Sequence, residues 1–203
     1  MRRSRAAFLL GLAAAGLLPV AAAATDIAIP YRPGPHPAAI PGAAAARVSV
    51  ALAQVPGAPV PTLVARMGTE AIHAGNNIPI ALADGMRQEL AARGCTLAPG
   101  HAAITLQVAD VEADFMADPL RGMRPASAPA GQLIATVAIV VIVRDPAGRP
   151  AFAAYRQAHA ARPYWFNTSN APDVQAVLTE AMRTVVGDAI ADPAFQRALA
   201  RAQ

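Results

Sequence analysis

The sequence has no lysine, a single cysteine and only nine aromatic residues among its 203 positions. A lone cysteine excludes an internal disulfide. The four histidines are never closer than 28 positions to one another, and neither a CxxC nor an HExxH pattern occurs. The local spacings typical of zinc sites are therefore missing. We expect no metal site, no cofactor and no catalytic constellation that can be read from a motif.

The positive charge of the chain does not indicate a nucleic-acid partner. All 17 basic residues are arginine, and three of them lie within the first five positions, ahead of an apolar run at 6–18. The small-residue stretch VAAAATD follows, and this order predicts a secretory signal peptide over residues 1–24, cleaved near Ala23–Thr25. The remaining 14 arginines face 13 acids without forming a run, so nucleic-acid binding is not expected.

The cleavage region also lacks the cysteine that a lipoprotein signal places there. Ala24 and Thr25 occupy that position, and Cys95 lies far downstream. A helix of about twelve apolar residues reaches only ~18 Å, against a hydrocarbon core of ~30 Å. The sequence therefore predicts an exported, periplasmic protein without a lipid anchor. It favours cleavage of the signal over its retention as an anchor, and it does not settle between the two.

The longest apolar run outside this signal, LIATVAIVVIV at 133–143, does not predict a membrane span. As a helix it would reach only ~16 Å. Seven of its residues are Ile or Val and one is Thr, which favours a strand. The turn sequence DPAG follows at 145–148, and the segment 151–161 can return as a partner strand. We predict the central strand of a sheet, apolar on both faces.

The rest of the chain divides into a tether and one domain. Five prolines lie between positions 30 and 41, which predicts a Pro/Ala-rich extended tether over residues 25–45. Residues 46–203 form a single domain, with helices at 78–94 and 171–193 because apolar residues recur there at helical spacing. The fold class expected is α+β: an antiparallel or mixed sheet of about four to five strands with two amphipathic helices packed on one face.

Two local features in this domain could carry chemistry. Asp110, Glu112 and Asp114 alternate along one strand and would share a face, as an acid/base pair, a cation site or a solvated strand face. The alternation shifts phase near Ala109, which predicts a β-bulge there. Cys95 follows a helix C-terminus, whose partial negative charge opposes thiolate formation, so we expect a buried and inert thiol.

The candidate partner-binding residues are Tyr164, Trp165 and Phe166. They are three of the nine aromatic residues and are consecutive, in a loop between a strand and a helix. Three successive side chains cannot all face inward, so at least one is expected at the surface, where aromatic residues are common in binding sites. The alternative is that Trp165 caps the helix–sheet core while the other two cover its edge.

The succession of pieces over roughly residues 46–200 resembles the YajG-type family of bacterial envelope lipoproteins. The pieces are VSVALAQV, ARMGTEAIHAGNN, LADGMRQELAARGCTL, ITLQVADVEADF, ATVAIVVIVRDPAGRPAFAAYRQ and VQAVLTEAMRTVVGDAIADPAFQRAL. The resemblance implies an exported α+β protein without catalytic residues, and similar small domains serve as accessory modules for envelope machinery, including activators of cell-wall synthases. The missing cysteine at the cleavage site departs from the family pattern and puts lipid attachment in doubt.

Three function classes follow from these observations. The first is a non-catalytic periplasmic protein that binds another envelope component. The second is a hydrolase whose site is assembled from scattered Asp, His and Ser residues, which would require His73, His101 or His159 to meet an acid and a hydroxyl in a cleft. The third is a carrier of lipid or another small ligand, which would require an apolar cavity between helices and sheet. The identity of a partner and the oligomeric state leave no trace in the sequence.

Overall fold

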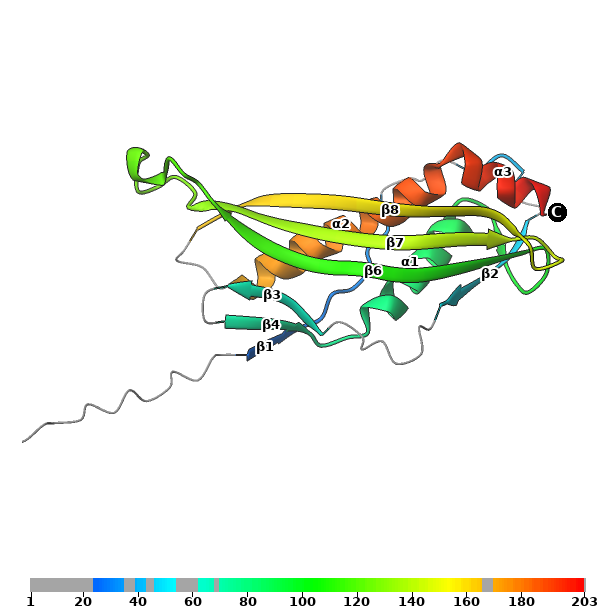
Figure 1. Cartoon of the computed structure of the whole chain (residues 1–203), viewed down its shortest axis with the longest axis horizontal. Coiled ribbons are helices and arrows are strands. Elements are labelled where there is room, and N and C mark those ends of the chain that lie inside the picture. The colour runs from blue at the N-terminus through cyan, green and yellow to red at the C-terminus, as the bar shows by residue number, and fades with distance from the viewer. Residues whose placement is uncertain are drawn as a thin grey trace, which may run out of the picture.

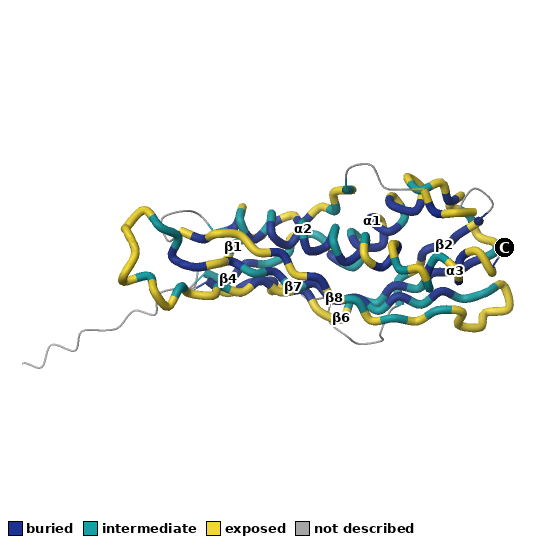
Figure 2. Tube along the Cα trace, turned by 90° about the horizontal axis from the view of Figure 1, so that it is seen from above, coloured by how far each residue is buried: buried dark blue, intermediate teal, exposed yellow. Residues whose placement is uncertain are grey.

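A computed structural model describes residues 24–34, 39–42, 46–53, 62–67, 70–165 and 170–202. The predicted signal peptide lies outside these residues up to position 23. The described chain forms one layer of β-sheet with helices packed against one of its faces (Figures 1 and 2). The fold is therefore of the mixed α+β kind.

The described residues contain eight strands and three α-helices. The strands are β1 (Ala24–Ile27), β2 (Arg47–Leu52), β3 (Leu63–Met67), β4 (Glu70–Ala74), β5 (Thr96–Leu97), β6 (Ala102–Ala117), β7 (Gly131–Arg144) and β8 (Pro150–Tyr164). The helices are α1 (Ile78–Ala92), α2 (Asn170–Ala191) and α3 (Pro193–Arg201), with a short 3-10 turn, η2, at Arg121–Met123. The expected number of four to five strands is wrong, because β1 and β4 are short and lack the alternation that marks a strand.

Three long antiparallel strands, β6, β7 and β8, run most of the length of the molecule (Figure 1). The edge of β6 that does not pair with β7 carries two short parallel strands, one after the other. The strand β2 pairs with the first half of β6, and β3 pairs with it at Ala113. Beyond these, β5 joins β2, β4 pairs antiparallel with β3, and β1 runs parallel to β4. The sheet is thus open and mixed.

The apolar run at 133–143 lies in β7, between β6 and β8, so the prediction of a central strand is confirmed. Its inward side chains, such as Val137 and Val141, are fully buried. Its outward side chains, such as Val140 and Ile142, are only partly covered. The predicted bulge is also confirmed, because the pairing of β6 with β7 shifts register between Val108 and Asp110.

Helices α1 and α2 both lie on the same face of the sheet (Figure 2), as the helical spacing predicted. The side chain of Asn77 caps α1 by accepting a hydrogen bond from the backbone N–H of Ile80. Gly94 follows the helix with a φ of 97°, the left-handed conformation that glycine adopts without strain. The second helix is broken after Ala191, where Asp192 caps the separate helix α3.

The first described segment, residues 24–34, is part of the domain, and we refer to it as the N-terminal strap. Four of its residues form β1, paired with β4, and Ile29 is fully buried. The amide side chain of Asn76 holds both backbone groups of Ile29, with an N to Oδ1 distance of 2.6 Å and an Nδ2 to O distance of 3.1 Å. The expectation of an extended tether beginning at position 25 is therefore wrong for these residues.

The strap continues across the helices and ends against α1. The hydroxyl of Tyr31 and the backbone N–H of Gly34 both donate to the carboxylate of Glu89, each at 3.1 Å. Glu89 is only 2% exposed, and Arg93 lies 3.5 Å from its second oxygen.

Burial, reinforced by the neighbouring Glu89 carboxylate, raises the pKa of the Tyr31 phenol. The ring of Tyr31 rests directly on Gly85 of α1. Side chains remote in the sequence thus hold residues 28–34, which contain two prolines and form neither helix nor strand.

Candidate functional site

The structure separates the aromatic residues that the sequence singled out. Tyr164 ends β8 and is 4% exposed, with its ring edge-on to Phe115 at 5.0 Å between centroids. Its hydroxyl donates to Asn170 at the start of α2, and burial raises its pKa. Trp165 is 39% exposed, and its indole N–H donates to the carbonyl of Ser127 at 3.4 Å. Phe166 lies outside the described residues. Tyr164 therefore belongs to the core, while Trp165 faces solvent.

Trp165 lies beside the long loop that joins β6 to β7, and we call residues 116–131 together with Trp165 the distal tip. The loop projects from the end of the molecule opposite the C-terminus (Figure 1). The tip carries four of the eight large apolar side chains that are exposed among the described residues: Met116, Leu120, Met123 and Trp165. Met123 is 88% exposed, the most of any of them. Exposed apolar side chains gathered in one place indicate an interaction surface.

The distal tip is held in shape by its own polar groups. The guanidinium of Arg121 donates to the carbonyls of Pro125 and Ala126, at 2.8 and 3.0 Å. Asp118 accepts from the backbone N–H of Leu120 at 2.9 Å and pairs with Arg124 at 3.0 Å. These bonds satisfy the loop internally and leave Met123 and Leu120 pointing outward. A loop already fixed in one conformation loses less entropy when it binds.

A cavity of about 270 Å³ adjoins the distal tip. It lies between the two sides of the loop and β8, with both polar and apolar lining residues: Met116, Ala117, Asp118, Pro119, Arg124, Pro129, Gly131, Gln132 and Pro163. One of the lining residues, Gly131, has no room for a side chain, because a Cβ at this position would lie 2.2 Å from the carbonyl oxygen of Met116. The cavity therefore extends the tip surface into a shallow recess.

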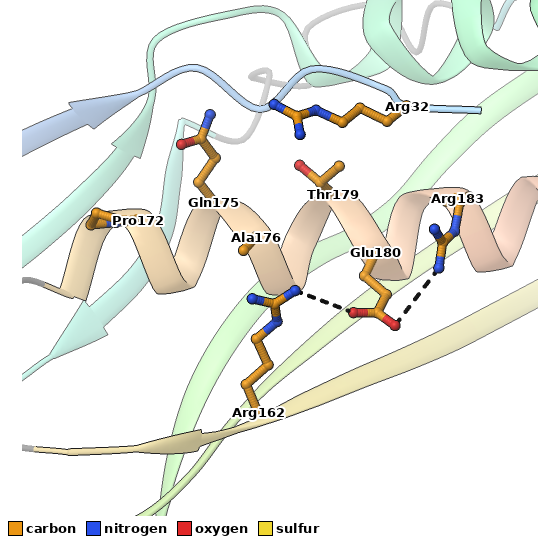
Figure 3. A pocket seen from close by; sticks show the side chains of 8 residues that line it. All are labelled: Arg32, Arg162, Pro172, Gln175, Ala176, Thr179, Glu180 and Arg183. Atoms are coloured by element: carbon orange, nitrogen blue, oxygen red, sulfur yellow. Dashed lines mark ion pairs between the residues drawn. The ribbon is translucent and has the colours of Figure 1, made fainter. Parts of the chain in front are cut away.

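A second hollow, the arginine groove, lies along α2 between the N-terminal strap and β8. It encloses about 260 Å³ and is lined by Arg32, Arg162, Pro172, Gln175, Ala176, Thr179, Glu180 and Arg183 (Figure 3). Arg32 comes from the strap, Arg162 from β8 and Arg183 from α2 (Figure 3). The sequence reasoning missed this site, because it assigned residue 32 to a free tether and took the arginines for scattered surface charges.

The three acids of β6 are all exposed on the face of the sheet that the helices do not cover. The neighbouring Asp110 carboxylate is the largest cause of a raised pKa at Glu112, followed by burial and Asp114. Glu112 pairs with Thr136 of the neighbouring strand β7, and the hydroxyl of Thr136 is 3.0 Å from Nδ1 of His159. This row lines neither the cavity beside the distal tip nor the arginine groove.

The other candidate groups stay apart. Within the described part of the chain, no three His, Cys, Asp or Glu side chains lie together as a possible metal site. Cys95 is buried, as expected, and this burial raises the pKa of its thiol. His101 is half-buried and directly precedes β6, and His73 lies in β4. No helix of the described residues is long and apolar enough to cross a membrane.

Comparisons with known proteins show the fold but no family. No protein-family model matches the sequence, and no curated protein matches it either. Protein XCC0632 from Xanthomonas campestris, of the DUF330 family, superposes with a TM-score of 0.55 at 15% identity, covering 88% of this chain and all of that one. Because the identity is so low, this likeness shows a shared fold alone.

Two weaker structural matches are bacterial proteins named as lipoproteins. A minor lipoprotein from Acinetobacter baumannii has a TM-score of 0.40 at 14% identity, covering 76% of this chain and 92% of that one. A lipoprotein candidate from Caulobacter crescentus has a TM-score of 0.36 at 14% identity, covering 64% and 83%. These scores are too low to assign a property to the present chain.

Proposed function

We propose that this chain is a non-catalytic, exported envelope protein of the YajG type, and that it binds another envelope protein through its distal tip. The observation that carries the proposal is the gathering of Met116, Leu120, Met123 and Trp165 at one end of the molecule. The export pattern at residues 1–24 supports the envelope location. The succession of pieces that resembles the YajG-type family supports the class of protein, since the observed strands and helices follow the same order.

The chemistry of the distal tip favours an apolar protein surface as its partner. Fully burying one large apolar side chain such as Met123 contributes roughly 1.5 to 3 kcal/mol. Methionine is unbranched and polarizable, and it adapts well to irregular partner surfaces. The cavity beside the tip can receive a projecting side chain of the partner, while Asp118 and Arg124 in its lining can supply polar contacts. The tip therefore combines exposed apolar side chains with polar groups, as protein interfaces do.

The proposal is tested by site-specific photocrosslinking in living cells of the native host. A photoreactive residue is placed at position 123 and, separately, at position 165. The matched control is position 80, because Ile80 is also an exposed apolar residue, at 50%, but lies on α1 away from the tip. We expect one dominant protein adduct from positions 123 and 165 that is absent from position 80, and mass spectrometry of this adduct identifies the partner.

Two outcomes would contradict the proposal. The same weak adducts at all three positions, or none at any, would show that the tip has no dedicated partner. An adduct with lipid and not with protein would show that the tip faces the membrane instead. As a second measurement, Met123→Glu should abolish the dominant adduct from position 165, because a charge would have to be desolvated in the interface, whereas Ile80→Glu should leave it intact.

A further inference from the structure

The arginine groove collects more positive charge than its own residues neutralise. Three guanidinium groups, from Arg32, Arg162 and Arg183, line it together with a single carboxylate, that of Glu180. The described residues provide no other acid in its lining. The groove therefore carries a net charge of about +2 at neutral pH, since arginine is always protonated in proteins.

The one carboxylate engages its two arginine neighbours only loosely. The nearest nitrogen of Arg162 is 3.8 Å from Glu180, and that of Arg183 is 3.7 Å away, both close to the 4 Å limit of an ion pair (Figure 3). The three side chains are 42 to 47% exposed. Such exposed, long contacts contribute little, so the guanidinium groups can turn toward a better acceptor at small cost.

Arg32 is the least occupied of the three. Within the described ranges, no residue forms an ion pair or hydrogen bond with its guanidinium. Its side chain extends from the strap above Thr179, on the opposite wall from Arg162 (Figure 3). The strap cannot swing away easily, because the side chain of Gln175 donates to the carbonyl of Ala28 at 2.6 Å. The groove is therefore a formed site with two arginine walls and a helical floor.

We propose that the arginine groove binds a phosphate monoester. A phosphate monoester carries about −1.5 to −2 charges at pH 7, which matches the net charge of the groove better than a single carboxylate does. The planar fork of arginine donates two parallel hydrogen bonds to phosphate oxygens, and three such forks, from Arg32, Arg162 and Arg183, line the groove. The hydroxyl of Thr179 supplies a further neutral donor on the floor. The volume of about 260 Å³ admits a small phosphate ester.

A phosphate monoester occurs both in free metabolites and in lipids whose headgroup is a phosphate monoester. Titration calorimetry with glycerol 3-phosphate, at low salt, measures the free form. Flotation with vesicles containing phosphatidic acid in phosphatidylcholine, against phosphatidylcholine alone, measures the lipid form. Saturable binding in either assay supports the proposal and names the source of the ligand. Absence of binding in both assays, with glycerol 3-phosphate tested up to about 10 mM, would overturn it.

Three charge variants separate a specific site from general attraction. Arg32→Gln should weaken binding by about tenfold or more, because a charge-assisted hydrogen bond is lost. Glu180→Gln should tighten it, because the competing carboxylate is neutralised, and no misfolded variant could mimic this gain. Arg149→Gln is the control, since Arg149 is 79% exposed in the β7–β8 turn and should leave binding unchanged. Equal loss from Arg32→Gln and Arg149→Gln, or weaker binding by Glu180→Gln, would refute the site.

The site and the distal tip are tested independently. The groove residues are not among those of the tip, so failure of the crosslinking experiment leaves the phosphate proposal standing, and the reverse also holds. Titration with succinate, a dianion with separated carboxylates, probes the ligand class. Binding of succinate as tight as that of glycerol 3-phosphate would contradict recognition of a phosphate monoester.

Discussion

Replacing Gly85 with alanine should destabilise the protein, although the same change in a helix interior ordinarily stabilises by about 1 kcal/mol. A Cβ at this position would lie 2.3 Å from Cδ2 and 2.4 Å from Cγ of Tyr31, where carbon atoms in contact are normally ~3.5 to 4.0 Å apart. The ring must therefore move by more than about 1 Å, which strains its hydrogen bond to Glu89.

The magnitude follows from two opposing effects. Overpacking a well-filled site costs about 1 to 3 kcal/mol, and loss of a buried hydrogen bond costs about 1 kcal/mol more. Subtracting the gain in helix propensity leaves a net loss of about 1 to 3 kcal/mol. For a chain of this size, each kcal/mol lowers the melting temperature by roughly 2 to 4 °C. Thermal unfolding followed by circular dichroism measures the shift.

Gly187 provides the matched control, because it lies inside α2 and a Cβ there would meet nothing within 4 Å. Gly187→Ala should therefore raise the melting temperature. In a Tyr31→Ala background the ring is gone, so Gly85→Ala should become stabilising, by about 0.5 to 1 kcal/mol. If Gly85→Ala stabilises the wild-type chain as Gly187→Ala does, Tyr31 does not rest on α1, and the account of the strap is wrong.

Three further predictions concern single contacts. Asn76→Ala should cost about 1 to 3 kcal/mol and speed hydrogen exchange of residues 24–29 but not of α2, because both buried backbone groups of Ile29 lose their partner; unchanged exchange in the strap would contradict this. Asp192→Ala should cost about 1 kcal/mol at pH 7 through loss of the α3 cap. The N–H of Ala194, and then Arg156, hold the pKa of Asp192 below its usual value, so the stability that Asp192 contributes is present above pH ~4 and is lost as pH falls through the lowered pKa. The difference in melting temperature between wild type and Asp192→Ala should therefore be smaller at pH 2 than at pH 7. A difference that stays constant would refute the charge effect. Glu112→Gln should raise the melting temperature at pH 7 and have little effect near pH 3, because the raised pKa means that ionisation of Glu112 weakens the fold as pH rises; a loss of stability at pH 7 would count against repulsion from Asp110.

Much of the sheet and both long helices could be predicted from the sequence. The β-branched run at 133–143, the DPAG turn after it and the phase shift near Ala109 each encode their structure locally, and the structure confirms all three. Helical spacing located α1 and α2 for the same reason. Short strands such as β4, with only five residues, carry too few alternations to be recognised.

The aromatic residues show where local reasoning stops. Three consecutive aromatics predict that at least one is exposed, and Trp165 is. The burial of Tyr164 depended on Phe115, which packs on it from a strand 49 positions away in the sequence. That Trp165 shares the distal tip with Met123 and Leu120 could not be predicted either, because these two residues lie in a Pro-rich loop without periodicity.

The sequence by itself determined the class of fold, the order of its long elements and the expectation of export, because periodicity, turn residues and a signal pattern are properties of neighbouring residues. The tertiary structure alone decided that the N-terminal strap belongs to the domain and that three separate arginines meet in one groove. The bond between Gln175 and Ala28 spans 147 positions. Contacts of that range depend on how the elements pack, and no local pattern encodes them.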